Sequence, residues 1–204
     1  MAGKRVQLFK YCTLDIAMKP ILKGGEIKTR ILRPIEYETL RSGTNTMNQK
    51  TLLDGCLLLG ARYEECRRIQ SNPEYFDGNF IHLPAEAQLK AKRKQNERWI
   101  RLSTLGKAII PYFLLCSSKL PDVHVWNKEL KRWAQKQDLD PVGISARTLR
   151  KTYESWLIMS YPEASNLIFL SQGHTTLTSL QHYINLPFTE EEKKEMRRWV
   201  EGWI

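Results

Sequence analysis

The spacing of apolar residues along the chain predicts a mainly helical protein. Two short stretches alternate apolar and polar residues as strands do, Asn79 to Leu83 and Arg98 to Leu102, and they flank the basic segment KAKRKQNE. Helical spacing runs through the segments 34–42, 48–60, 63–70, 106–116, 122–137 and from 145 onward. We therefore expect a mainly α fold of the α+β class, with a small antiparallel sheet that carries a basic hairpin.

The last 16 residues predict an amphipathic helix. Thr189 and Glu192 form a capping box, and an apolar stripe follows it through Met196, Trp199, Val200, Trp203 and Ile204. So apolar a face at the end of the chain must be buried somewhere.

Length and charge narrow the function classes. The 204 residues predict one domain, and the net charge of +10 favours a polyanionic partner such as nucleic acid. No apolar run is long enough to span a membrane, and nothing after Met1 resembles a signal peptide, so we expect no membrane partner and a soluble, intracellular protein.

The cysteines predict no metal site. The sequence has no CxxC pair, and none of its four histidines lies at a spacing from a cysteine that is typical of metal ligands. Cys56 and Cys66 lie at apolar positions of predicted helices. We interpret these two as reduced core residues.

The segment from Ile144 to Phe188 carries the candidate chemistry. Arg147 and Arg150 share one face of a predicted helix, His174 follows Gly173, which is expected to end a helix, and Tyr183 lies about two turns further on. Two guanidinium groups, an imidazole and a phenol suit chemistry on a phosphodiester, because a planar guanidinium donates two hydrogen bonds to a phosphate. Taken singly, the histidine also suits a capping or core position, and the tyrosine a half-buried helix position.

Other segments supply the remaining parts of such a site. Arg62 lies at a Gly-Ala break between two buried helices, where a charged side chain has no obvious packing role. A lysine of the basic hairpin is a candidate general acid for the leaving oxygen, namely Lys90, Lys92 or Lys94. The same run also suits a solvated turn or a phosphate-contacting patch.

Together these motifs resemble the catalytic domain of tyrosine recombinases, the phage-integrase family. The first family box, Thr-Gly-x-Arg-x-x-Glu, is matched by LGARYEE at 59–65, and the second, His-x-x-Arg, by RTLR at 147–150. The third, Leu-Gly-His with a tyrosine nine residues later, is matched by QGH at 172–174 and by Tyr183. The resemblance covers residues 34–188, which would form the catalytic domain after a basic lead-in (1–33) and before the C-terminal helix (189–204).

The resemblance implies a tyrosine-recombinase-like fold with a small three-stranded antiparallel sheet, and a role for each matched residue. Arg62 and Arg150 would hold the scissile phosphate, His174 would assist, and Tyr183 would form a 3′-phosphotyrosyl link. Lys92 would protonate the leaving 5′ oxygen, with Lys90 and Lys94 as alternatives because the family register points to Arg93. Expected DNA contacts are Lys90, Arg93, Lys94 and Lys151. No cofactor or metal is implied.

The implied function is that of a site-specific DNA recombinase, an integrase that inserts or excises a mobile element or viral genome. Its partners would be a double-stranded attachment site and further copies of the chain, in a tetramer on DNA within a prokaryotic cell. The stripe through Trp199 and Trp203 would pack against a neighbouring copy in this tetramer or fold back on its own domain. Arg147 departs from the family, where histidine is usual, and integrases of some archaeal viruses and plasmids look similar there. With about 33 residues before the match, a catalytic fragment and a minimal member are both open. The alternatives are a type IB topoisomerase-like relaxing enzyme and a catalytically inactive basic DNA-binding protein.

Overall fold

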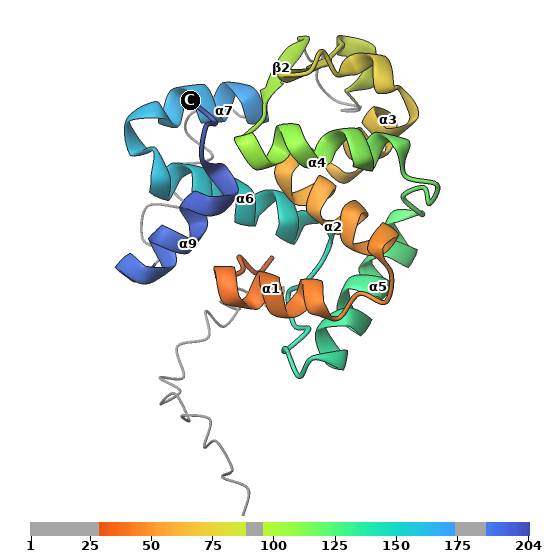
Figure 1. Cartoon of the computed structure of the whole chain (residues 1–204), viewed down its shortest axis with the longest axis vertical. Coiled ribbons are helices and arrows are strands. Elements are labelled where there is room, and N and C mark those ends of the chain that lie inside the picture. The colour runs from red at the N-terminus through yellow and green to blue at the C-terminus, as the bar shows by residue number, and fades with distance from the viewer. Residues whose placement is uncertain (1–28, 89–95, 174–186) are drawn as a thin grey trace, which may run out of the picture.

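The computed structural model describes residues 29–88, 96–173 and 187–204 (Figure 1). Its α-helices are α1 (Pro34–Ser42), α2 (Met47–Leu59), α3 (Tyr63–Ser71), α4 (Thr104–Leu115), α5 (Val123–Lys136), α6 (Ala146–Ser160), α7 (Ser165–Gln172) and α9 (Glu190–Val200). Short 3₁₀ turns lie at Pro73–Tyr75, Ala85–Ala87 and Pro162–Ala164, and the strands are β1 (Phe80–Leu83) and β2 (Arg98–Arg101). The mainly helical α+β class is confirmed.

Local sequence signals start these helices where the apolar spacing predicts them. The Thr46 hydroxyl accepts a hydrogen bond from the Gln49 amide at the start of α2, and Ser103 does the same for Gly106 at the start of α4. Asp122 caps α5 through the His124 amide, and Pro34 occupies the first turn of α1. Each cap satisfies a backbone donor that the helix leaves open, which places the helix start within a residue or two of the prediction.

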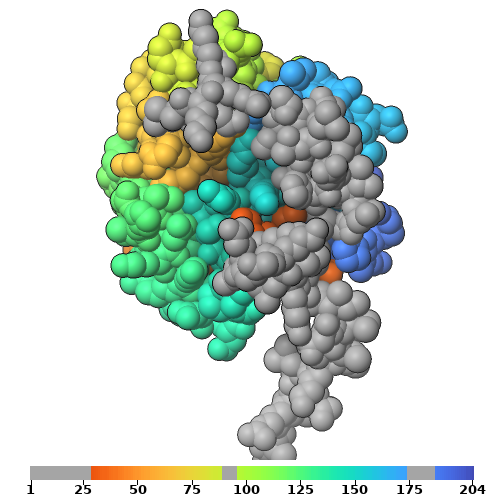
Figure 2. All heavy atoms as spheres, turned by 180° about the vertical axis from the view of Figure 1, so that it is seen from behind, coloured from red at the N-terminus to blue at the C-terminus, as the bar shows by residue number. Residues whose placement is uncertain are grey.

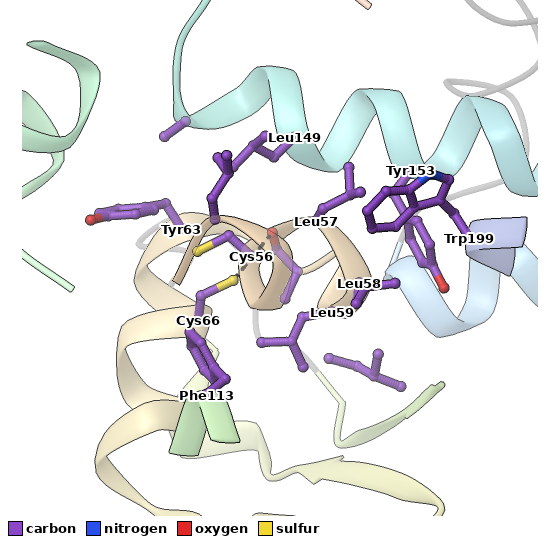
Figure 3. Packing of buried hydrophobic residues seen from close by; sticks show 14 of the residues in the cluster. Cys56, Leu57, Leu58, Leu59, Tyr63, Cys66, Phe113, Leu149, Tyr153 and Trp199 are labelled. Atoms are coloured by element: carbon purple, nitrogen blue, oxygen red, sulfur yellow. Dashed lines mark hydrogen bonds between the residues drawn. The ribbon is translucent and has the colours of Figure 1, made fainter. Parts of the chain in front are cut away.

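The core surrounds α2, which packs against α4 and α6. Leu57, Leu58 and Leu59 are fully buried, and Figure 3 shows them between Tyr153 of α6 and Phe113 of α4. Cys56 and Cys66 lie in the same cluster as buried free thiols, so their predicted core position is confirmed. Because α6 is buried on nearly every side, its polar groups face the interior and need internal partners.

The chain enters this core just before α1. Leu32 is fully buried; its amide donates to the Thr152 hydroxyl at 3.0 Å, and its carbonyl accepts from the Trp156 indole at 3.1 Å. These bonds hold the residues before α1 along the middle of α6.

The sheet is smaller than predicted. β1 and β2 pair antiparallel, from Phe80 opposite Arg101 to Leu83 opposite Arg98, and the part of the chain that the structure describes adds no third strand to them. Phe76 forms only a single bridge to Ile81, because the Asp77 carboxylate accepts from the amides of Asn79 and Phe80 and closes a tight turn at once. The three-stranded expectation therefore does not fit the residues described.

The C-terminal helix α9 folds back onto its own domain. Thr189 and Glu192 form the predicted capping box, and α9 packs along α6 with Arg33 paired to Glu192. The Trp199 ring lies 5.0 Å from Tyr37, edge to face, and 6.2 Å from Trp156. Of the two predicted packing partners for this helix, the structure of the single chain shows its own domain.

Candidate functional site

The first arginine is placed by a sharp turn between α2 and α3. Gly60 ends α2 with φ +56°, and a Cβ there would lie 2.5 Å from the Gln172 side-chain nitrogen and 2.9 Å from the Tyr153 ring. The turn makes Arg62 the residue that precedes α3, and its amide donates to the Glu65 carboxylate at 2.8 Å. This geometry leaves the Arg62 side chain partly exposed at the start of the helix.

The second and third arginines come from the first two turns of α6. Ser145 is the N-cap, as predicted, and its amide donates to the Thr148 hydroxyl at 2.9 Å. Arg147 is exposed, whereas Arg150, one turn later, is buried and donates from Nη2 to the Gln172 carbonyl. Two guanidinium groups with very different solvation therefore start from one helix face.

Glu65 joins three arginines from separate parts of the chain. Its Oε1 accepts from Arg62 Nη1 at 2.6 Å, its Oε2 accepts from Arg98 Nη2 at 2.7 Å, and Oε2 lies 3.8 Å from Arg150 Nη1. We call Glu65, Arg62, Arg98 and Arg150 the Glu65 cluster. One buried carboxylate facing three guanidinium groups leaves the cluster with an excess of positive charge.

The charges in the Glu65 cluster and its burial lower the pKa values of two of its members, Glu65 and Arg150. Burial alone would raise the pKa of Glu65, but hydrogen bonds from Arg98 and the charges of Arg98, Arg62 and Arg150 outweigh it and lower the pKa to about 2. Burial, followed by repulsion from Arg62, lowers the pKa of Arg150 to about 10. Both groups stay ionised at neutral pH, so Arg150 offers a desolvated positive charge.

Arg98 is a member of the cluster that sequence reasoning missed. Its Nε donates to the Ser171 carbonyl at 3.0 Å and its Nη1 to the Gln88 side chain at 2.5 Å. The strand pattern could have indicated this position. Arg98 lies two residues before the buried Ile100, and residues two apart in a strand point to the same face of the sheet, here the core side. An arginine on the buried face of a strand requires a buried acidic partner.

A cleft opens beside this cluster between the starts of α3 and α6. It has a volume of about 260 Å³, and Arg62, Arg147 and Arg150 line it together with Tyr63 and Val123. We call it the α3–α6 cleft; Figure 2 shows the face of the molecule where the colours of α3, α5 and the start of α6 meet. Since two helices begin at this cleft, their dipoles add positive potential to that of the three arginines.

The structure places four of the predicted site residues and leaves the others outside the described ranges. Arg62, Arg147 and Arg150 line one cleft; Lys151 is half-buried on α6 and is not among the cleft residues. Gly173 ends α7 in the left-handed region, as predicted, and its carbonyl accepts from Arg62 Nη2 at 3.4 Å. The residues outside the described ranges are Lys90, Lys92, Arg93, Lys94, His174 and Tyr183.

No family model and no curated protein matches this chain. The chemistry of the site must therefore be argued from its residues. Among residues 29–88, 96–173 and 187–204, no three His, Cys, Asp or Glu side chains gather as metal ligands would. Within the same ranges, no helix is both long and apolar enough to cross a membrane.

Proposed function

We propose that this protein is a DNA strand transferase of the tyrosine-recombinase type, which cleaves and rejoins DNA through a 3′-phosphotyrosyl intermediate. The observation that carries the proposal is the meeting of Arg62 and Arg150. They lie 88 residues apart in the chain, yet both contact Glu65 and both line the α3–α6 cleft. The family boxes predict this meeting, and helical spacing alone does not.

The cleft suits a phosphodiester in the act of being attacked. In-line attack adds charge to the non-bridging oxygens, and guanidinium groups already held in place stabilise that charge without reorganisation. Glu65 and the Gln172 carbonyl hold Arg150, while Glu65 and the Gly173 carbonyl hold Arg62. Each arginine is thus oriented by a partner before any substrate binds.

The reaction is a transesterification. The Tyr183 phenolate, after loss of its proton to solvent, forms a bond to phosphorus. The bond from phosphorus to the 5′ oxygen breaks, and a hairpin lysine, which we place at Lys92 with Lys90 and Lys94 as alternatives, gives its proton to that oxygen. Neither ATP nor a metal ion enters this balance. In the sequence His174 follows Gly173 directly, and the Gly173 carbonyl accepts a hydrogen bond from Arg62 Nη2 at 3.4 Å.

Arg147 takes an electrostatic part in this scheme. A guanidinium stays protonated at neutral pH and cannot accept the phenol proton, unlike the histidine usual at this position. Positive charge from Arg147, Arg150 and Arg62 instead lowers the pKa of a nearby phenol, which increases the phenolate fraction available for attack.

We assign the protein to site-specific integration or excision of mobile or viral DNA, working as an oligomer on a duplex attachment site. A type IB topoisomerase-like activity would use the same chemistry without pairing two sites. Relaxation of supercoiled plasmids that share no sequence would favour that alternative.

Trapping of a covalent complex tests the proposal. The protein is incubated with supercoiled and nicked DNA that includes the DNA flanking its own gene, and the reaction is stopped with denaturant. The wild type is expected to yield a protein–DNA adduct, and Tyr183→Phe none. Tyr112→Phe, which removes the hydroxyl of an exposed tyrosine on α4, is the matched control and should retain the adduct. Absence of adduct from the wild type would reduce the protein to a DNA-binding role.

A further inference from the structure

A second cavity adjoins the α3–α6 cleft at the start of α6. It has a volume of about 400 Å³ and lies between α5 and α6, and we call it the α5–α6 groove. The two cavities share Val123, Ala146 and Arg147. Arg147 therefore lies where the cleft passes into the groove and faces both.

The groove is lined by positive and neutral polar groups. Lys131 of α5 and Arg147 of α6 carry its charges, and Asn127, Ser145 and Thr29 add polar groups. No carboxylate is among the described residues that line it. The cleft differs, because there Glu65 and Glu64 are already paired with arginines.

Within the described ranges, neither Lys131 nor Arg147 takes part in an ion pair, although both are exposed. Their neighbours on the same helices behave differently: Arg132 pairs with Glu129, one turn back on α5. Two exposed cations without internal partners that face one groove create a positive potential there, which favours an anion from outside.

We propose that the α5–α6 groove binds the sugar–phosphate backbone of a DNA strand next to the phosphate held in the α3–α6 cleft. Lys131 contacts the flanking phosphate, and Arg147 spans the two phosphates from the junction. Asn127 is already engaged in the fold, since its Oδ1 accepts from the Ala146 amide at 2.7 Å, and its role is to hold the groove wall. This inference rests on the proposed function for the identity of the strand, and it explains why an arginine suits position 147.

The salt dependence of DNA binding tests the groove directly. The probe is a labelled duplex of arbitrary sequence, bound to the full chain at several salt concentrations. Each phosphate contact contributes about 0.9 to the slope of log affinity against log salt, so Lys131→Gln should flatten the slope by about that amount. It should also weaken binding several-fold at low salt, and Lys131→Arg should restore both values.

Lys194→Gln is the matched control. Lys194 is exposed on α9, outside the groove, and its loss removes the same charge from the chain. The proposal predicts a larger change in slope for Lys131→Gln than for Lys194→Gln. Equal changes in the two variants would show a diffuse charge effect and overturn the groove. Equal displacement of the duplex by an acidic polypeptide and by an unlabelled duplex of matched charge would also overturn it.

The experiments distinguish failure of the strand-transferase proposal from failure of the groove proposal. An adduct that depends on Tyr183, together with an unchanged slope in Lys131→Gln, would leave the transferase standing without the groove. A flattened slope without any adduct would leave the groove as the surface of a DNA-binding protein.

Discussion

At the scale of single residues, Glu65 determines how much positive charge reaches the α3–α6 cleft. Its carboxylate is 2% exposed and contacts Arg62, Arg98 and Arg150, which come from three different elements. Arginines so close together would repel one another without it. Breaking a buried charge network by removal of one partner is far more costly than loss of a surface pair.

Replacement of Glu65 by glutamine should lower the free energy of unfolding by about 3 kcal/mol at neutral pH. The reason is that three guanidinium groups lose their common counter-charge. Urea unfolding measures this loss. Glu195→Gln, which removes a surface carboxylate 2.8 Å from Arg198 on α9, should cost at most about 0.5 kcal/mol.

The same residue predicts a pH dependence. The pKa of Glu65 is lower in the folded chain, about 2, than its ordinary value of 4.5, so its contribution is complete above pH 4.5. Stability should fall as the pH drops from 4.5 towards 2, and this part of the fall should be absent in Glu65→Gln. An identical acid profile in both proteins would contradict the role assigned to Glu65.

At the scale of elements, the position of α9 decides what the C-terminal aromatic stripe does. Trp199 packs on Tyr37 and Trp156, and Trp203, which lies past the end of α9, is also buried. The stripe thus covers the part of α6 that carries Trp156.

Trp199→Ala should therefore lower the free energy of unfolding by about 3–5 kcal/mol, measured at concentrations where the chain is monomeric. The control is Trp99→Ala on β2, because Trp99 is 50% exposed and its loss should cost much less. If monomer stability were unchanged in Trp199→Ala and only DNA-bound assembly were lost, the helix would instead pack against a neighbouring copy.

Prediction from the sequence succeeds where the physics is local. The start of α6 follows from Ser145, and the start of α9 from Thr189 and Glu192, because caps act within one helical turn.

Prediction from the sequence fails where the structure depends on a partner that is distant in the chain. Arg98 is buried because Glu65 and Gln88 meet it, and no spacing within the strand names those partners. Among the residues that the structure describes, Phe76 makes only a single bridge to Ile81 and extends into no third strand, because the Asp77 side chain closes a turn directly after it.

The candidate site also combines features that local spacing predicts with features that it does not. Helical periodicity predicts that Arg147 and Arg150 share a face of α6, which follows from three-residue spacing. That Arg62 joins them depends on the resemblance to tyrosine recombinases, since the intervening chain contains three further helices and a sheet. Arg62 also makes a bond that no pattern predicts, to the Gly173 carbonyl.

At the scale of the whole molecule, the Glu65 cluster, the α3–α6 cleft and the α5–α6 groove adjoin one another, and we propose that together they form the path of a DNA strand. Helices α3, α5 and α6 contribute to this path, while α9 packs against α6, and α1 packs against α5 and α9 (Figure 1). The chain's net charge of +10 gives such a path long-range attraction for DNA, which salt should weaken steeply.

The most direct test of the central claim is the chemistry of the covalent link itself. After trapping with denaturant, the DNA is digested to a short remnant, and the attached peptide is identified by mass spectrometry while the freed DNA end is tested for a 5′ hydroxyl. The account predicts a nucleotide joined through its 3′ phosphate to Tyr183, and a 5′ end that accepts a label from a kinase without prior phosphatase treatment. A link to another residue, a link through a 5′ phosphate, or no link at all would contradict it.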